Sequence, residues 1–144
     1  MTRIEFHFNA TDKLAYVSRF LRKGTSQGTR IFVVAEDADL KRLDEALWAL
    51  SPHDFVSHCV GLDDPIAAQY SSVILSTEVV PVPGVQVGVH LGAEVPADFS
   101  RFDRWIEVVS DDPGDRSQAR ARWKQYTAMG YTLLRKDLNL KSAN

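Results

Sequence analysis

The stretch RIFVVAED, residues 30–37, decides the fold class of this chain. Residues 31–34 are all large and apolar, so the strand that they predict must be covered on both faces, as central strands of parallel sheets are. Apolar side chains at helical spacing lie on either side of it, from Leu14 to Leu21 and from Leu40 to Trp48. A strand between two such helices predicts right-handed strand–helix–strand crossovers and a mostly parallel sheet.

Other strands are predicted from apolar runs and from alternation. They lie at 3–8, 55–60, 73–75, 86–91 and 104–109. The first of them is expected to be half-buried, because its apolar residues alternate with polar ones. The prolines before residue 86 favour an edge or a turn at that point.

Three helices are predicted from apolar spacing and from capping residues. The expected N-terminal caps are Asn9 or Thr11 for the first helix, Asp37 or Asp39 for the second, and the stretch DDPGD, 111–115, for the third. Ser51 and Pro52 are expected to end the second helix.

These elements predict an α/β fold: a single three-layer domain over residues 1–144. The chain has 144 residues, of which 44% are hydrophobic, enough for one core that removes about 70% of the unfolded surface from water. Its one cysteine, Cys59, allows no internal disulfide. The N-terminal sequence has no signal peptide and no membrane helix is expected, so we predict a cytoplasmic protein.

The charge of the chain is unevenly distributed. The net charge is −2, but residues 116–144 hold seven bases and one acid, a net +6, so the preceding 115 residues carry −8. A basic end on an acidic body favours an anionic partner at that end and opposes the wrapping of a long duplex. The simpler alternative is a basic segment that is only solvated.

The sequence indicates no catalytic, metal or cofactor site. The first two strand-to-helix turns, FNATDK and VVAEDADLK, contain no glycine, so the backbone geometry that holds phosphates is missing and the fold is expected to resemble nucleotide-binding folds without their phosphate loop. His53, His58 and Cys59 lack a fourth metal ligand. Asp44 and Glu45 point about 100° apart on a helix, so they form no acid/base pair and are interpreted as a solvated face.

The third helix carries the first candidate binding surface. Arg116, Arg120 and Lys124 are spaced by four and form a ridge, with Trp123 beside it. Charged donors next to an aromatic face suit a short acidic peptide that carries an apolar residue. The alternative places Trp123 in the core with Ala119 and Tyr126, and the arginines in water.

The second candidate surface lies at the end of the second helix. Trp48 and Phe55 are large apolar groups close to the Ser51-Pro52 break, and exposed aromatics of this kind usually mark a protein contact. Core packing is the alternative for Trp48.

At these stretches the sequence resembles the chi subunit family of the bacterial DNA polymerase III holoenzyme. The similarity lies in RLDEALWAL (42–50) with FVSH (55–58), and in FDRWIEVV (102–109) followed by ARARWKQYTAMGYTL (119–133). It covers about half of the chain in blocks.

The resemblance implies a non-catalytic replisome accessory protein with no cofactor. Chi subunits bind the acidic C-terminal tail of single-stranded-DNA-binding protein, which ends in Asp, Pro and Phe, and link it to the clamp-loader complex, so that DNA is contacted only indirectly. Carried over by motif, the residues that bind the tail are Arg116, Arg120, Trp123 and Lys124. Trp48 and Phe55 match the surface that holds the psi subunit.

Two other functions stay open from the residues. One is a small α/β enzyme whose site the sequence does not reveal. The other is direct binding of single-stranded DNA by the basic end, with Trp123, Tyr126 and Tyr131 as stacking platforms.

Overall fold

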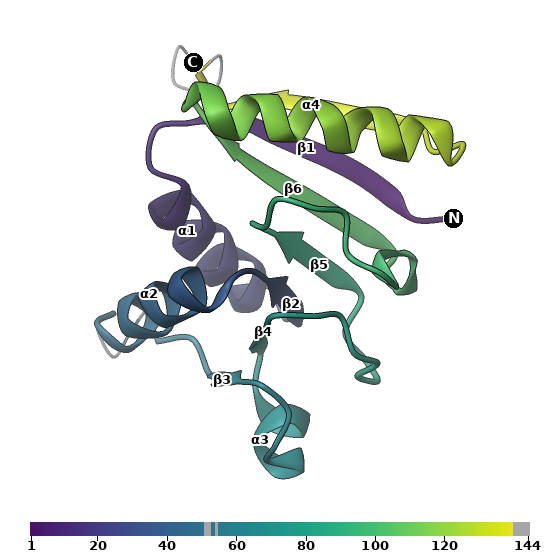
Figure 1. The fold of residues 1–144 in the computed structure, drawn as a ribbon. Helices are drawn as coiled ribbons and strands as arrows, with labels where there is room; N and C mark the ends of the chain where they lie inside the picture. Colours follow the sequence, from purple (N-terminus) through teal and green to yellow (C-terminus); the bar gives the residue numbers. More distant parts are fainter. Residues whose placement is uncertain (51–52, 54, 140–144) are drawn as a thin grey trace.

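The computed structural model describes residues 1–50, 53 and 55–139, and these form one seven-stranded sheet with helices on its faces (Figure 1). The strand order is β3-β4-β2-β5-β6-β1-β7, and every pair is parallel. The predicted α/β class with a mostly parallel sheet is confirmed.

The strands agree with the apolar runs of the sequence but differ at their ends. They are β1 (Arg3–Ala10), β2 (Ile31–Val34), β3 (His58–Val60), β4 (Val73–Ser76), β5 (Val87–His90), β6 (Arg104–Ser110) and β7 (Leu133–Asp137). β3 is shorter than predicted, and β7 was not predicted because LLRKD has little apolar pattern.

The helices are α1 (Lys13–Ser26), α2 (Asp37–Trp48), the short α3 (Pro65–Tyr70) and α4 (Pro113–Ala128), with a 3-10 turn η1 at Phe99–Arg101. α3 was not predicted. No helix in the described part of the chain is both long and apolar enough to cross a lipid bilayer.

Capping residues were predicted correctly for one helix of three. Asp112 caps α4, because its carboxylate accepts the Asp115 N–H. The cap of α1 is Asp12, which accepts the Ala15 N–H, and not Asn9 or Thr11. Asn9 instead lies near the end of β1 in a left-handed backbone conformation, with φ 67°.

The second helix also differs from its prediction. α2 begins at Asp37, and Glu36 before it makes no side-chain capping bond, so neither Asp37 nor Asp39 is the cap. The predicted end residues Ser51 and Pro52 lie outside the described residues.

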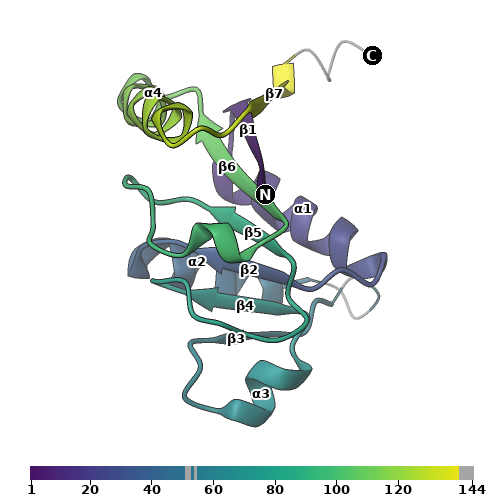
Figure 2. The same cartoon turned by 90° about the vertical axis from the view of Figure 1, so that its right-hand side faces the viewer.

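Two hydrophobic cores lie on opposite faces of the sheet, because neighbouring residues of a strand point to opposite sides. In β2, Ile31 and Val33 pack with α1 and α2, while Phe32 and Val34 pack on the other face. α4 covers that second face over β1, β6 and β7, and Figure 2 shows α1 and α4 on opposite sides of these strands.

The alternation in β1 predicted a half-buried strand, and this prediction is wrong. β1 lies inside the sheet between β6 and β7, so both of its faces are covered. Its polar residues Glu5 and His7 are buried and paired with each other at 3.0 Å. Arg104 of β6 holds Glu5 through two hydrogen bonds of 2.6 and 2.9 Å. Tyr16 donates to Nδ1 of His7 at 2.7 Å. The alternation of apolar and polar residues in β1 therefore reflects one apolar and one polar face, both of which are covered.

Candidate binding site beside helix α4

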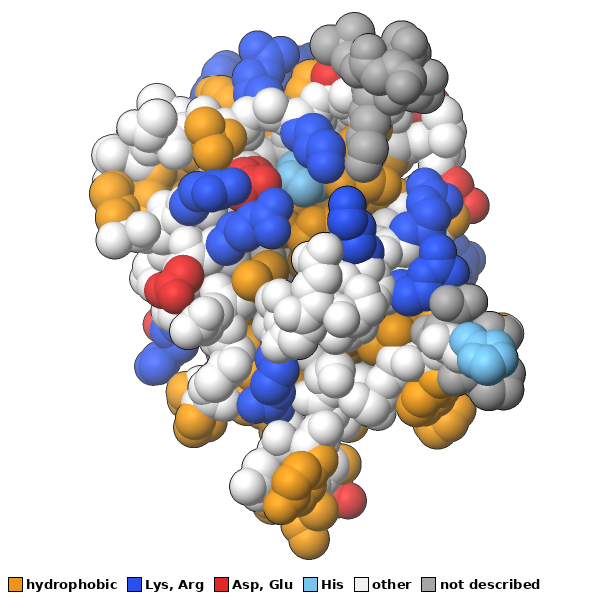
Figure 3. Space-filling view, turned by 180° about the vertical axis from the view of Figure 1, so that it is seen from behind, with side chains coloured by type: hydrophobic (Ala, Val, Ile, Leu, Met, Phe, Trp, Pro, Cys, Tyr) orange, Lys and Arg blue, Asp and Glu red, His pale blue; other side chains and the backbone are white. Residues whose placement is uncertain are grey.

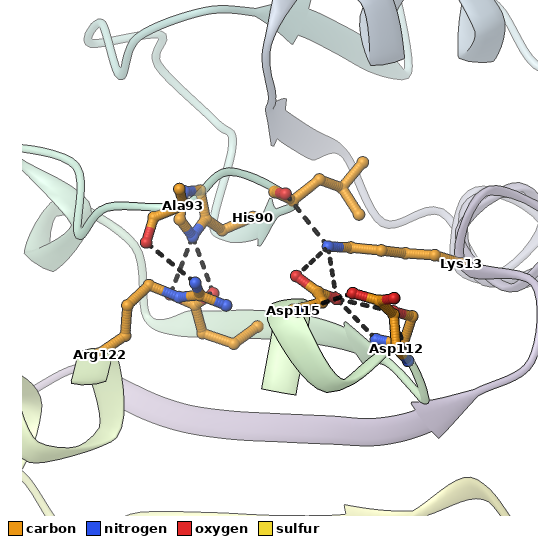
Figure 4. Close-up of polar contacts among 9 residues, drawn as sticks. Lys13, His90, Ala93, Asp112, Asp115 and Arg122 are labelled. Carbon is orange, nitrogen blue, oxygen red and sulfur yellow. Dashed lines mark hydrogen bonds and ion pairs between the residues drawn. The ribbon is translucent and has the colours of Figure 1, made fainter. Parts of the chain in front are cut away.

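Helix α4 is fixed at its N-terminus by ion pairing and hydrogen bonding. The carboxylate of Asp115 accepts the Ser110 N–H at 2.8 Å and pairs with Lys13 of α1 at 3.1 Å (Figure 4). Burial alone would raise the pKa of Asp115, but the Ser110 N–H and the Lys13 ammonium lower this pKa below its ordinary value. The start of the helix is thus held to both β6 and α1.

The buried side of α4 is held by an ionic network. Arg122 is 1% exposed and donates to Glu107 of β6 at 3.1 Å and to the Ala93 carbonyl at 3.0 Å. His90 donates to the same carboxylate at 2.8 Å, and Figure 4 shows it beside Arg122. Tyr126 also donates to Glu107 and accepts a bond from Trp105.

This network changes the ionisation of the groups inside it. Burial would raise the pKa of Glu107, but the charges and hydrogen bonds of His90 and Arg122 outweigh it and keep this pKa below its ordinary value. Burial and the neighbouring Glu107 carboxylate both raise the pKa of Tyr126. Glu107 is therefore a buried anion, and Arg122 compensates it.

The opposite edge of α4 borders a pocket of about 310 Å³. Its walls are apolar and come from two strands and the helix: Phe6, Phe8, Val109 and Ala119. The rest of the lining is one indole, that of Trp123, and three guanidinium groups, those of Arg116, Arg120 and Arg135.

Trp123 packs both inward and outward, as an amphipathic ring can. Its indole meets Phe6 edge-on with 5.0 Å between centroids, so one edge joins the core. The guanidinium of Arg135 lies 5.9 Å from the indole centroid and 5.3 Å from that of Phe8. The two alternatives for Trp123 are thus both partly met: the side chain packs against the core and also lines the pocket.

The structure brings together three of the four residues that the sequence assigned to this surface. Arg116, Arg120 and Trp123 line the pocket, whereas Lys124 is exposed on α4 outside the lining. Arg122, which the sequence also placed near Trp123, points into the core.

Sequence reasoning missed the strand residues of the pocket. Phe6 and Phe8 lie on one face of β1, and their alternation could have indicated it. Arg135 belongs to β7, which was not predicted.

Trp48 and Phe55 form a separate aromatic patch with His58. Their side chains are 62% and 46% exposed, so core packing of Trp48 is excluded. The ring centroids of Trp48 and Phe55 are 5.4 Å apart, and those of Trp48 and His58 are 5.1 Å apart. His58 is held by Asp44 at 2.9 Å, so Asp44 is not simply part of a solvated face.

The comparisons with known proteins cover most of the chain. The family model described as DNA polymerase III chi subunit, HolC, matches residues 1–134. The chain belongs to the chi subunit family of DNA polymerase III. Chi is an accessory subunit of the polymerase and not a catalytic one.

Curated relatives of the chi family match over most of their length. The chain is 27% identical to DNA polymerase III subunit chi of Pseudomonas aeruginosa, over 92% of this chain and 94% of that protein. It is 30% identical to the Haemophilus influenzae subunit chi, over 74% of each.

A solved structure shares the fold of this chi-family chain. The C-terminal domain of Dbp5 from S. cerevisiae, solved with Gle1 and IP6, superposes with a TM-score of 0.63 over 95% of this chain and 90% of that one. Because the sequences are only 15% identical, the likeness concerns the fold alone.

The carboxyl edge of the sheet, where α/β folds usually bind nucleotides, is acidic in this chi-family chain. Asp12 caps α1, Asp37 and Asp39 lie in the first turn of α2, and Asp112 caps α4. A phosphate at these helix ends would meet like charges, and the caps of α1 and α4 already bond one N–H group each.

The described residues also bear on metal binding and on the stacking of single-stranded DNA, which were both considered from the sequence. No group of three or more His, Cys, Asp or Glu among them could hold a metal ion. Tyr126 is fully buried and bonded, so it cannot act as a stacking platform for single-stranded DNA.

Proposed function

We propose that the pocket beside α4 binds the acidic C-terminal tail of single-stranded-DNA-binding protein. The observation that supports this best is an apolar hollow bordered by the guanidinium groups of Arg116, Arg120 and Arg135. A tail that ends in phenylalanine offers a ring for the hollow and a terminal carboxylate for an arginine. Preceding aspartates suit the remaining cations, including exposed Lys124.

The expected affinity is modest. One hydrogen-bonded charge pair contributes about 1.5–3 kcal/mol and a buried ring adds about 1.5–3 kcal/mol. Ordering of a flexible tail subtracts from this sum. We therefore expect a micromolar complex that weakens as salt rises, and avidity from several tails on one oligomer.

A synthetic acidic peptide ending in phenylalanine tests this function. Arg120→Ala should weaken its binding at least tenfold, about 1.4 kcal/mol, in a fluorescence anisotropy titration. Arg135→Ala should weaken it too, and Lys124→Ala should have a smaller effect because Lys124 lies outside the pocket lining.

Two controls make this test specific. Arg42 is exposed on α2, far along the chain from the pocket residues, and Arg42→Ala should leave binding unchanged. A peptide with a C-terminal amide should bind wild type less tightly, since it lacks the terminal carboxylate. Equal binding of the acidic peptide by wild type and Arg120→Ala would reject the role of Arg120.

For the aromatic patch, we propose contact with a psi-like subunit, which would connect this chain to the clamp-loader complex in the cytoplasm. Two exposed neighbouring rings resemble the centre of a protein interface.

Trp48→Ala should change the free energy of unfolding by less than about 0.5 kcal/mol, because the ring is mostly in water. It should weaken psi binding at least tenfold, about 1.4 kcal/mol, in a co-purification or calorimetric assay. Unchanged psi binding by Trp48→Ala would contradict this assignment.

A further inference from the structure

A basic groove of about 700 Å³ lies on the α1 face of the sheet, on the side opposite the α4 pocket. Its lining includes the first residues of β2, β5 and β6 and residues between Tyr16 and Gly24 of α1. Figure 3 shows this face, where lysine and arginine side chains surround a hollow with apolar surface above the middle of the view. Its lining contains five cations: Arg19, Arg22, Lys23, Arg104 and Lys136.

These cations converge from three elements of the fold. Arg19, Arg22 and Lys23 come from α1, Arg104 begins β6, and Lys136 lies on β7. Among the described residues that line the groove, none is acidic, although the chain as a whole has 19 acids and 17 bases. A solvated basic helix face would not account for the two cations that the sheet contributes.

The buried groups beside the groove respond to this charge. Burial lowers the pKa of His7, and the charges of Lys136 and Arg104 lower it further, although Glu5 opposes them. The Glu5 carboxylate already has two cationic partners, because it pairs with Arg104 and also with Arg3 at 2.9 Å. The Glu5 carboxylate is therefore shared between Arg104 and Arg3, while the exposed side chains of Arg19 and Lys23 add positive charge to the groove.

Aromatic and apolar groups lie between the cations. Tyr16 and Phe20 line the groove with a centroid separation of 6.4 Å, and the guanidinium of Arg104 lies 5.7 Å from the Phe20 centroid. Val87 adds some apolar surface to the lining, and the buried Ile31 lies beneath the groove. Cations beside rings in a concave groove match a charged strand with aromatic bases, and rings that can stack on unpaired bases favour a single strand over a duplex.

We propose that this groove binds the sugar–phosphate backbone of a single-stranded nucleic acid, with bases packed against Tyr16 and Phe20. Such a site would let an accessory subunit of a DNA polymerase touch template or primer directly, at a surface separate from the α4 pocket. DNA and RNA share this chemistry, and parallel measurements with both strands distinguish them.

The test uses the whole protein and labelled oligothymidylate and oligouridylate of about 15 nucleotides in fluorescence anisotropy at low salt. The test variant is Arg19→Gln with Lys23→Gln, and both side chains are exposed. The matched control is Lys41→Gln with Arg42→Gln, which removes the same charge from exposed positions of α2. Thermal melting followed by circular dichroism checks that both variants are folded.

Wild type should bind at least one of the two oligonucleotides. The groove variant should bind it at least tenfold more weakly, and the control should lose less than about twofold. The slope of log K against log salt should become shallower by about 1.4 in the groove variant, since each phosphate contact on a single strand contributes about 0.7. Arg120→Ala, in the α4 pocket, should bind like wild type.

Three results would overturn the proposal. The first is no binding of either strand by wild type at low salt. The second is an equal loss in the groove variant and in its α2 control, which would indicate a general charge effect. The third is displacement of the oligonucleotide by polyglutamate at equal charge concentration, which would assign the groove to an acidic protein.

Discussion

Strands β1, β6 and β7 serve both faces of the sheet, and the two faces differ in how they use charge. On the α4 face, Phe6 and Phe8 line an apolar pocket, and buried charges there form a network around Glu107. On the α1 face, Glu5 is paired with several cations beside an open basic groove. The comparison teaches that one strand can supply two unrelated surfaces, because its alternate residues face opposite ways.

The largest expected effect tests the Glu107 network of the α4 face. Arg122→Met should lower the free energy of unfolding by about 3–5 kcal/mol, because it leaves Glu107 buried without its guanidinium partner. Urea unfolding measures this loss. Arg120→Met, two residues away and exposed, should change stability by less than about 0.5 kcal/mol.

Adding Glu107→Leu to Arg122→Met should restore part of the lost stability, since the uncompensated anion is removed. Similar small losses for Arg122→Met and Arg120→Met would show that the network does not hold the α4 face.

A smaller effect compares the helices that cover the two faces. Asp112 caps α4 and Asp12 caps α1, and replacing either by Ala should cost about 1 kcal/mol of stability. Glu36 precedes α2 without a side-chain capping bond, so Glu36→Ala should cost clearly less in the same urea unfolding series. An equal cost at all three positions would mean that general charge effects, and not capping, dominate.

The smallest expected difference is the response of each face to mild acid. The pKa of His7 lies below its ordinary value of 6.5 because of burial, so the unfolded chain binds more protons below that pH and stability should fall from pH 7 towards 5. Glu5 and Glu107 have pKa values lowered from 4.5 and should lose their contribution only below that pH.

His7→Gln should therefore flatten the dependence of unfolding free energy on pH between 7 and 5, measured by urea titration at several pH values. An unchanged slope in His7→Gln would show that burial of His7 does not cause the acid response.

The sequence predicted the fold well wherever a strand is apolar on both sides. Residues 31–34 and 104–109 were located closely because both of their faces are buried in cores. β7 was missed because three of its five residues are exposed and its pattern is polar. A polar edge strand carries little signal until the sheet beside it is known.

The site was predicted in part for a similar reason. Helical spacing located Arg116, Arg120 and Trp123 together, but it could not show that Arg122 pairs with a buried acid on β6. The signal for that pairing was Glu107 itself, a charge in the middle of an apolar strand, which requires a buried partner. The far wall of the pocket depends on which strands neighbour β1, and local patterns do not contain this information.

The neighbours Arg135 and Lys136 on β7 illustrate what this sharing of strands entails. Arg135 lies over Phe8 and Trp123, while Lys136 lines the groove on the other side. A shift of β7 by one residue, for instance through an insertion near Gly130, would exchange the two side chains between surfaces. Asp137 would change sides together with Arg135, and the flat guanidinium would no longer stack on the indole. The length of one short turn thus controls the composition of two distant surfaces at once.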